Sequence, residues 1–161
     1  MKTIYLVRHA KAEEKTIPGK DFDRALTSKG ISDSIMMGKR LASMHIQPGI
    51  IVSSPAQRAL QTAKIVKENI NHSGELILNE NIYYSKAEKL IEIIKNTEEN
   101  IQSIMLVGHN PSFNELMHYL CNTNIDNISK AGIVGIKLTE KKWEKISHKC
   151  GILLFYNSPK T

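Results

Sequence analysis

The sequence lacks long apolar runs and any recognisable targeting segment. No stretch approaches the roughly 20 consecutive apolar residues that a membrane-spanning helix needs. The mixed run at the N-terminus is broken by Arg8, whereas a signal peptide carries an uninterrupted apolar region before its cleavage site. We therefore expect a cytoplasmic protein with no membrane partner.

Cysteine and metal ligands are scarce as well. Cys121 and Cys150 are the only two cysteines, too few to staple a domain of 161 residues that can bury its own core. They do not have metal-ligand or CxxC spacing, and the six histidines form neither an HExxH motif nor a cluster with cysteine. The sequence predicts two reduced thiols, no bound metal and no cofactor.

Nucleic-acid-binding motifs are also absent, although the net charge is +6. Such a charge attracts phosphate-bearing partners of every kind and does not by itself choose among them. The one dense basic cluster is KKWEK at 141–145. Because Trp143 and Ile146 look like strand positions, we interpret this cluster as a solvated hairpin and expect no nucleic-acid partner.

The residues that are present are typical of one globular domain. Apolar residues make up 41% of the chain and charged residues 24%, which are ordinary values for such a protein. A chain of 161 residues suits one domain and is too short for two comfortable ones. We find no repeat, low-complexity tract or long linker, and we expect a single domain over 1–161 that is a monomer.

Strand and helix patterns alternate along most of the chain. Buried-strand runs lie at 3–7, 50–53, 76–78 and 103–108. Apolar residues recur at helical spacing at 31–42, 56–66, 90–94 and 113–120. This alternation predicts a wound α/β sheet.

The tail has a different pattern. Its segments 132–138, 143–147 and 151–156 predict strands joined without helices, and the polar stretch 121–131 predicts a loop. The expected fold class is therefore α/β, with a mixed central sheet that is mostly parallel and has an antiparallel portion.

Two helix starts are marked by capping residues. In SSPAQ, Ser54 is expected to cap, Pro55 to occupy the first helical position and Gln57 to complete a capping box. In GHNPS, Asn110 is expected to cap a helix that Pro111 opens. Both helices would begin just after a strand.

Two arginines and two histidines lie near the carboxyl ends of the predicted strands. Arg8 and His9 end the first strand, Arg58 lies in the first turn after the second, and His109 follows the fourth. Ligands of open α/β sheets bind beyond these ends. Guanidinium groups bind phosphate oxygens in bidentate fashion, and helix N-termini favour anions. The four residues therefore predict a phosphate site.

A histidine in such a site can do chemistry. A neutral imidazole is a nucleophile that can form a covalent phosphoryl intermediate, and we assign that role to His9. Its other ring nitrogen must then be held by a hydrogen bond that fixes the tautomer. His109 would offer its N–H or its imidazolium charge to the phosphoryl oxygens in an in-line transition state.

Three motifs in this order resemble those of the histidine phosphatase superfamily, also called phosphoglycerate mutase-like: LVRHA at 6–10, SSPAQRALQTA at 53–63 and LVGHNP at 106–111. The segment DFDRALTSKG at 21–30 and the ending LLFYNSPK at 153–160 look like the SixA-type phosphohistidine phosphatases, so the likeness covers nearly the whole chain. The resemblance implies a three-layer α/β/α sandwich and a metal-independent phosphatase.

The resemblance also implies roles for single residues. It makes His9 the phosphorylated nucleophile, His109 the second histidine, and Arg8 and Arg58 the phosphate clamps. Arg24 matches a family arginine that assists with phosphate, although Ala25 stands where the family usually has proline. We expect Arg24 and Asn110 to bind substrate.

A glutamate general acid, which larger branches of the superfamily carry after the third strand, is missing from its usual setting. Glu13, Glu14, Asp21 and Asp23 follow the first motif and could rim the pocket, and Glu80 and Glu88 follow the third strand. We interpret all six as solvated charges and assign no acid. An alkoxide leaving group needs a proton, and lacking a placed acid costs about 10²–10⁴-fold in rate. A phosphohistidine nitrogen can already carry that proton, so the gap favours phosphohistidine over alkyl phosphates.

The sequence thus predicts a phosphatase that acts on a phosphohistidine-bearing protein, such as a phosphotransfer or carrier domain, through phospho-His9. A small-molecule phosphatase or mutase of the same superfamily is one alternative. A non-catalytic phosphoprotein-binding domain with the same clamp is another. A nucleic-acid module is the most distant one, because it rests on the net charge alone.

Overall fold

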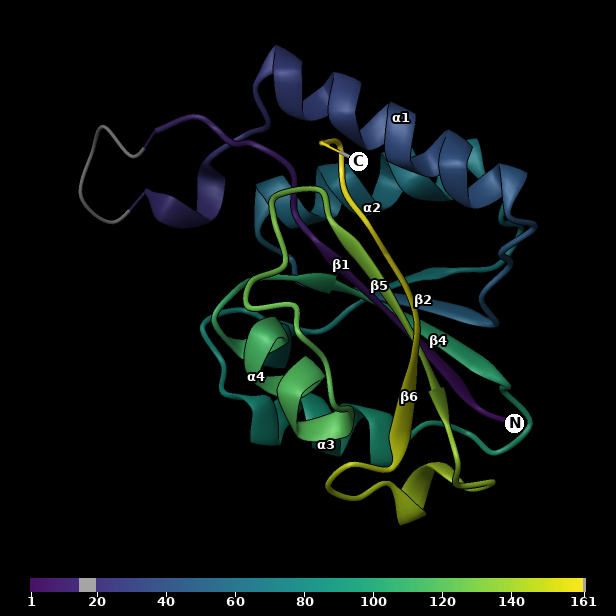
Figure 1. Ribbon diagram of the computed structural model, residues 1–161. Helices are drawn as coiled ribbons and strands as arrows, with labels where there is room; N and C mark the ends of the chain where they lie inside the picture. Colours follow the sequence, from purple (N-terminus) through teal and green to yellow (C-terminus); the bar gives the residue numbers. More distant parts are fainter. Residues whose placement is uncertain (15–19, 161) are drawn as a thin grey trace.

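Six strands form one sheet in the order β3-β2-β4-β1-β5-β6, in a computed structural model that describes residues 1–14 and 20–160 (Figure 1). The strands are β1 (Thr3–Arg8), β2 (Ile50–Ser53), β3 (Leu76–Leu78), β4 (Ser103–Gly108), β5 (Ile133–Leu138) and β6 (Gly151–Asn157). The first four pair in parallel, whereas β5 pairs antiparallel with both β1 and β6. The predicted mixed, mostly parallel sheet is confirmed.

Helices cover both faces of this sheet. The helices are α1 (Ser28–Ser43), α2 (Gln57–Asn69), α3 (Ala87–Lys95) and α4 (Ser112–Leu120). Helices α1 and α2 lie on one face, and α3 and α4 lie on the other (Figure 1). The predicted three-layer α/β/α sandwich is confirmed. No helix in the described part of the chain is long and apolar enough to cross a membrane.

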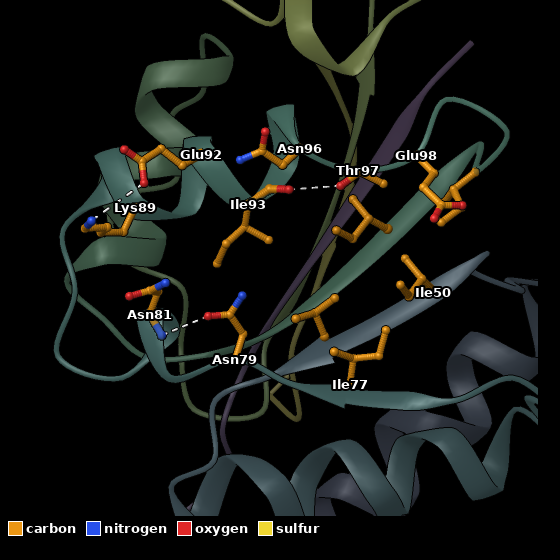
Figure 2. A pocket seen from close by; sticks show the side chains of 13 residues that line it. Ile50, Ile77, Asn79, Asn81, Lys89, Glu92, Ile93, Asn96, Thr97 and Glu98 are labelled. Atoms are coloured by element: carbon orange, nitrogen blue, oxygen red, sulfur yellow. Dashed lines mark hydrogen bonds and ion pairs between the residues drawn. The ribbon is translucent and has the colours of Figure 1, made fainter.

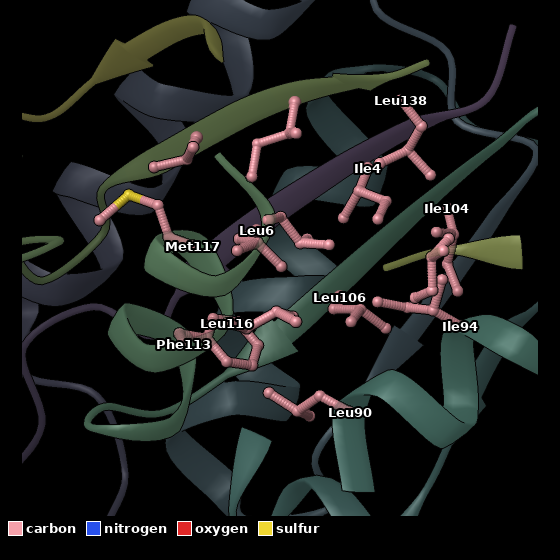
Figure 3. Close-up of a cluster of buried hydrophobic side chains, with 14 of the residues drawn as sticks. Ile4, Leu6, Leu90, Ile94, Ile104, Leu106, Phe113, Leu116, Met117 and Leu138 are labelled. Carbon is pink, nitrogen blue, oxygen red and sulfur yellow. The ribbon is translucent and has the colours of Figure 1, made fainter. Parts of the chain in front are cut away.

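Alternate residues of the central strands pack into two apolar clusters, one on each face of the sheet. On β1, Ile4 and Leu6 pack with Phe113 on the side of α3 and α4 (Figure 3). Val7 packs with Leu41 on the side of α1 and α2. Successive strand residues point to opposite faces, and all five side chains are at most 1% exposed. Burial on both faces explains the nearly continuous apolar sequence of this strand.

The strands that carry the predicted motifs end at one level. Arg8 of β1 lies opposite Gly108 of β4, and Ser53 of β2 lies opposite Val107 of β4. The residues that follow these three strands therefore emerge together at one edge of the sheet.

The predicted strand at 143–147 is wrong. Trp143–Lys145 forms a short 3₁₀ helix, and β5 pairs with β6 instead. The Trp143 side chain is fully buried, and its Nε1 donates a hydrogen bond to the carbonyl oxygen of Ile101 at 2.8 Å. The apolar character of this charged segment therefore comes from the single buried ring of Trp143, and not from the alternating apolar residues of a strand. The charged residues of the cluster are exposed, as the solvated-hairpin interpretation expects, and they lie in the connection between the antiparallel strands β5 and β6.

The expected start of α2 also needs correction. This helix begins at Gln57, two residues after Pro55, and no side chain caps it. The Ser54 hydroxyl accepts a hydrogen bond from the Ala56 amide at 3.2 Å, which makes a local turn before the helix.

Replacing the buried indole should be costly. Trp143→Ala is expected to lower the free energy of unfolding by about 3–5 kcal/mol, because it opens a cavity and removes the donor to Ile101. Ile152→Ala is the control, since Ile152 is 56% exposed and its loss should cost no more than about 0.5 kcal/mol. Urea denaturation measures both values. Equal stability of the two variants would contradict the buried 3₁₀ helix.

Candidate active site

A cavity of about 420 Å³ lies at the carboxyl ends of the parallel strands. All six residues that the sequence predicts for the site line it: Arg8, His9, Arg24, Arg58, His109 and Asn110. Asp21, Tyr84 and Ser85 join them. The fold thus gathers residues from five separate segments of the chain around one cavity.

The orientation of His9 is set by the backbone beside it. Its Nδ1 lies 2.8 Å from the carbonyl oxygen of Ala10, and a carbonyl can only accept, so Nδ1 carries the proton and Nε2 keeps its lone pair. The Ala10 amide donates to the Thr62 hydroxyl at 3.1 Å, and that hydroxyl donates to the Arg58 carbonyl at 2.8 Å. These bonds tie the histidine segment to the first turns of α2.

Both histidines of the site are neutral at pH 7. Burial, followed by the charges of Arg58 and Arg8, lowers the pKa of His9 to about 4, although the bond to Ala10 opposes the shift. Burial, followed by the neighbouring His9, lowers the pKa of His109 to about 3. Each side chain is 8% exposed, and the ring centroids are 5.2 Å apart. Of the two forms considered for His109, the neutral ring is the one present.

His109 is held from the side of β2. Its Nε2 lies 2.8 Å from the hydroxyl oxygen of Ser54, while its Nδ1 is buried without a partner in the described part of the protein. Ser54, which the sequence predicts as a helix cap, therefore contacts a catalytic candidate instead. One ring nitrogen is engaged, and the other has no hydrogen-bond partner among the described residues.

Asp21 organises the arginines and was missed from the sequence. Its carboxylate accepts hydrogen bonds from Arg58 Nη2 at 3.1 Å, from Arg24 Nε at 3.0 Å and from the Tyr83 hydroxyl at 2.7 Å. Burial alone would raise the pKa of this carboxyl. The hydrogen bonds from Tyr83 and the neighbouring Tyr84, together with the charges of Arg58 and Arg24, lower it well below its usual range. Asp21 is therefore ionised.

The interpretation of Asp21 as a solvated charge is wrong, because the residue is only 9% exposed. The other five carboxylates interpreted in that way are exposed: Glu13, Glu14, Asp23, Glu80 and Glu88. Its spacing of three residues from Arg24 is the only local signal, and such pairs are common on any surface turn. Tyr83 gives no signal at all, since it lies 62 residues further along the chain in no motif.

Unpaired polar atoms concentrate around this cavity. Four buried atoms of its lining residues have no hydrogen-bond partner in the described part of the chain: Arg8 Nε, Arg58 Nε, Ser85 Oγ and His109 Nδ1. An unmatched buried polar group costs about 1–3 kcal/mol, so one such atom is unusual and four together are more so. A ligand rich in acceptor oxygens, such as a phosphoryl group, would pair with these donors.

Asn110 has a fully engaged side chain. Its Oδ1 accepts from the Asn114 amide at 3.1 Å. The prediction that Asn110 caps a helix opened by Pro111 is wrong, because α4 begins at Ser112, Pro111 is at the N-cap position, and no side chain caps the helix. The Asn110 Nδ2 donates to Asn127 Oδ1 at 3.1 Å and to the Ile128 carbonyl at 3.0 Å. These bonds hold the loop at 121–131 beside the site, and a direct role of Asn110 in substrate binding stays a prediction.

Another cavity, of about 470 Å³, lies between α3 and the sheet edge formed by β2 and β3 (Figure 2). Ile50, Ile77 and Ile93 contribute apolar surface to it, and amide side chains such as Asn79 and Asn96 lie around them. Its described lining residues include no histidine, arginine or cysteine. The groups able to bind and transfer a phosphoryl group therefore lie at the other cavity.

Comparison with known proteins finds a matching family model and similar folds. Residues 4–83 match the family model described as histidine phosphatase superfamily (branch 1). An uncharacterised protein of Picosynechococcus sp. is 26% identical over 98% of this chain and 96% of its own. SixA from Agrobacterium tumefaciens has the same fold, with a TM-score of 0.85 and 24% identity over 98% of both chains. The protein histidine phosphatase SixA in complex with tungstate gives a TM-score of 0.83 and 20% identity over 98% and 97% of the two chains.

The lowered pKa values predict a pH dependence of stability. Unfolded histidines bind protons near pH 6.5, whereas His9 and His109 in the folded protein do so near pH 4 and 3. The unfolded state binds more protons between pH 5 and 7, so stability falls as the pH is lowered through this window, by on the order of 2 kcal/mol for each histidine. The lowered pKa of Asp21 acts only below about pH 4.

Urea denaturation at pH 7 and pH 5 measures this change. In the His109→Gln variant, the decrease in the free energy of unfolding from pH 7 to pH 5 should be about half as large, since only one of the two histidines remains. A free energy of unfolding that is equal at the two pH values would show that the site histidines titrate normally.

Proposed function

The chain belongs to the histidine phosphatase superfamily, and on that premise we propose that it hydrolyses phosphohistidine on a protein through a phosphoryl group carried covalently by His9. The state of His9 carries this proposal. The ring is neutral, its Nδ1–H is fixed on the Ala10 carbonyl, and its Nε2 lone pair is free to attack phosphorus.

The arginines supply the binding of the phosphoryl group. Arg8 and Arg58 each have an unpaired Nε beside the cavity, and Arg24 is held at its edge by Asp21. Guanidinium groups pair with phosphoryl oxygens through charge-assisted hydrogen bonds. The complex of the similarly folded SixA with tungstate supports this assignment, because tungstate is a tetrahedral oxyanion like phosphate.

In the first step, His9 Nε2 attacks phosphorus in line with the substrate's phosphorus–nitrogen bond. The new nitrogen–phosphorus bond forms as the old one breaks, and the electron pair leaves with the substrate's imidazole. The proton on His9 Nδ1 stays in place, so the phosphorylated ring is cationic and is stabilised by the Ala10 carbonyl. His109 and the arginines stabilise the charge on the equatorial oxygens.

In the second step, water attacks the phosphorus of phospho-His9. The bond to Nε2 breaks, its electron pair returns to the ring, and a proton of the water passes to the departing phosphate. The ring is then neutral again, with the proton still on Nδ1, so the enzyme is ready for another turnover.

The leaving group can be inferred from the absence of an available acid. Asp21 is the one carboxylate among the described residues that line the cavity, and its lowered pKa keeps it ionised at neutral pH. It cannot donate a proton to an alkoxide, which would cost a phosphate ester about 10²–10⁴-fold in rate. The imidazole of phosphohistidine leaves as a neutral ring when its second nitrogen carries a proton.

Exposed aromatic side chains near the cavity support the proposal that the substrate is a protein. Tyr84 lines the cavity and is 75% exposed, and Phe22 nearby is 40% exposed. Both rings contact Tyr83: Tyr84 is tilted against it at a centroid distance of 4.3 Å, and Phe22 meets it edge-on at 5.2 Å. Exposed aromatic side chains of this kind are enriched where proteins bind one another.

One observation favours a second candidate, a phosphatase for a small phosphate ester. The cavity volume of about 420 Å³ is also within the range of small-molecule pockets. This alternative requires an acid that the described lining residues do not offer at neutral pH.

Phosphate release decides between these functions. The purified chain, without added metal, should release phosphate from a phosphohistidine-containing carrier protein, and His9→Ala should reduce the rate to background. His148→Ala, at an exposed histidine outside the cavity, is the matched control and should be fully active. Turnover confined to a panel of metabolite phosphates would favour the ester phosphatase. Binding of the carrier without any turnover would identify a non-catalytic binder.

A further inference from the structure

A basic pocket adjoins the candidate active site. It has a volume of about 240 Å³, and Arg8 lines both it and the catalytic cavity. Its other cationic residues are Lys11, Lys29, Lys130 and Lys160. A group held in this pocket would lie directly beside a phosphoryl group bound by Arg8.

The four lysines come from four distant parts of the chain. Lys11 follows β1, Lys29 lies in the first turn of α1, Lys130 precedes β5 and Lys160 follows β6. Hydrogen bonds hold two of these segments in place. The Ala131 amide donates to the Arg8 and His9 carbonyls at 3.1 Å, and Arg40 Nη1 donates to the Ser158 carbonyl at 2.6 Å, which holds the C-terminal end near α1 (Figure 1).

Most of the net charge of the protein lies around these two pockets. Their described lining includes seven cationic side chains and two carboxylates, with both histidines neutral, which gives a net charge of +5 against +6 for the whole chain. Among the described residues that line the basic pocket, Asp33 is the only carboxylate, and it pairs with Lys29 at 3.4 Å. The remaining lysines of this pocket are therefore not neutralised by its own lining.

The exposure of the lysines indicates the kind of anion. The Lys29 side chain is 66% exposed, and Lys11, Lys130 and Lys160 are exposed as well. Long, hydrated ammonium groups steer and orient acidic partners rather than enclosing a small anion. The catalytic cavity differs from this pocket, because its Arg8 and Arg58 each have a buried Nε without a partner, which suits a small group such as phosphoryl.

We propose that this pocket docks acidic side chains on the surface of the substrate protein, next to its phosphohistidine. The proposal rests on the function proposed above and adds a partner chemistry to it: a phosphohistidine flanked by surface Asp or Glu residues. Docking at an exposed basic surface accelerates association and lowers KM, without changing the transition state at His9.

Charge reversal tests the docking surface. In Lys11→Glu/Lys130→Glu, kcat/KM for a phosphohistidine carrier with an acidic surface should fall about tenfold or more, with kcat retained. Turnover of free phosphoramidate should stay within about twofold of the wild-type value, since the catalytic residues are unchanged. Lys141→Glu/Lys142→Glu is the matched control, with the same change of net charge at exposed positions in the turn between β5 and β6.

The two substrates separate the two proposals. Unchanged carrier kinetics in Lys11→Glu/Lys130→Glu, or an equal loss in the control variant, would overturn the docking site and leave the catalytic proposal standing. A loss confined to a bisphosphorylated small molecule would assign the pocket to a second phosphate and overturn docking of a protein. No turnover of either the carrier or phosphoramidate by the wild-type chain would overturn the proposed function, and the docking proposal with it.

Discussion

The pairing of β1 with β4 is the constraint on which the site depends. Because Arg8 lies opposite Gly108, His9 and His109 leave their strands side by side, with ring centroids 5.2 Å apart. β2 ends at the same level and brings Ser54 against His109. A slip of one residue would turn every side chain of β1 to the opposite face and exchange its contacts between the two apolar clusters. The packing of the core therefore fixes the geometry of the chemistry.

Burial and positive charge together set the protonation of the site. Burial is the largest cause of the lowered pKa values of His9 and His109, and the charges of Arg58 and Arg24 add to it. For Asp21, burial is opposed by hydrogen bonds from the two tyrosines and by the two arginines, which together lower its pKa. The result is a neutral nucleophile beside an ionised carboxylate, with no proton to give at neutral pH. Such a site suits a leaving group that brings its own proton.

Local patterns predicted the ends of the strands, and hence the meeting of His9 and His109, because strands that run in parallel must end at the same edge. They did not predict the burial of Asp21, since its environment is built by Tyr83 and by Arg58 of another helix. They led to a wrong prediction at Trp143, because one buried aromatic residue in a short charged segment gives the same sequence pattern as an inward-facing strand residue. In each case the missing information was a contact between residues far apart in the sequence, which periodicity does not carry.

The position of the phosphoryl group on the enzyme tests the central claim most directly. Rapid acid-free quenching during turnover of a phosphohistidine carrier, followed by mass spectrometry and ³¹P NMR of the trapped chain, locates that group. We predict phosphorylation at Nε2 of His9, because Nδ1 is held by the Ala10 carbonyl. A phosphoryl group on His109 or on Nδ1 of His9, or steady turnover with no phosphorylated enzyme, would contradict the account.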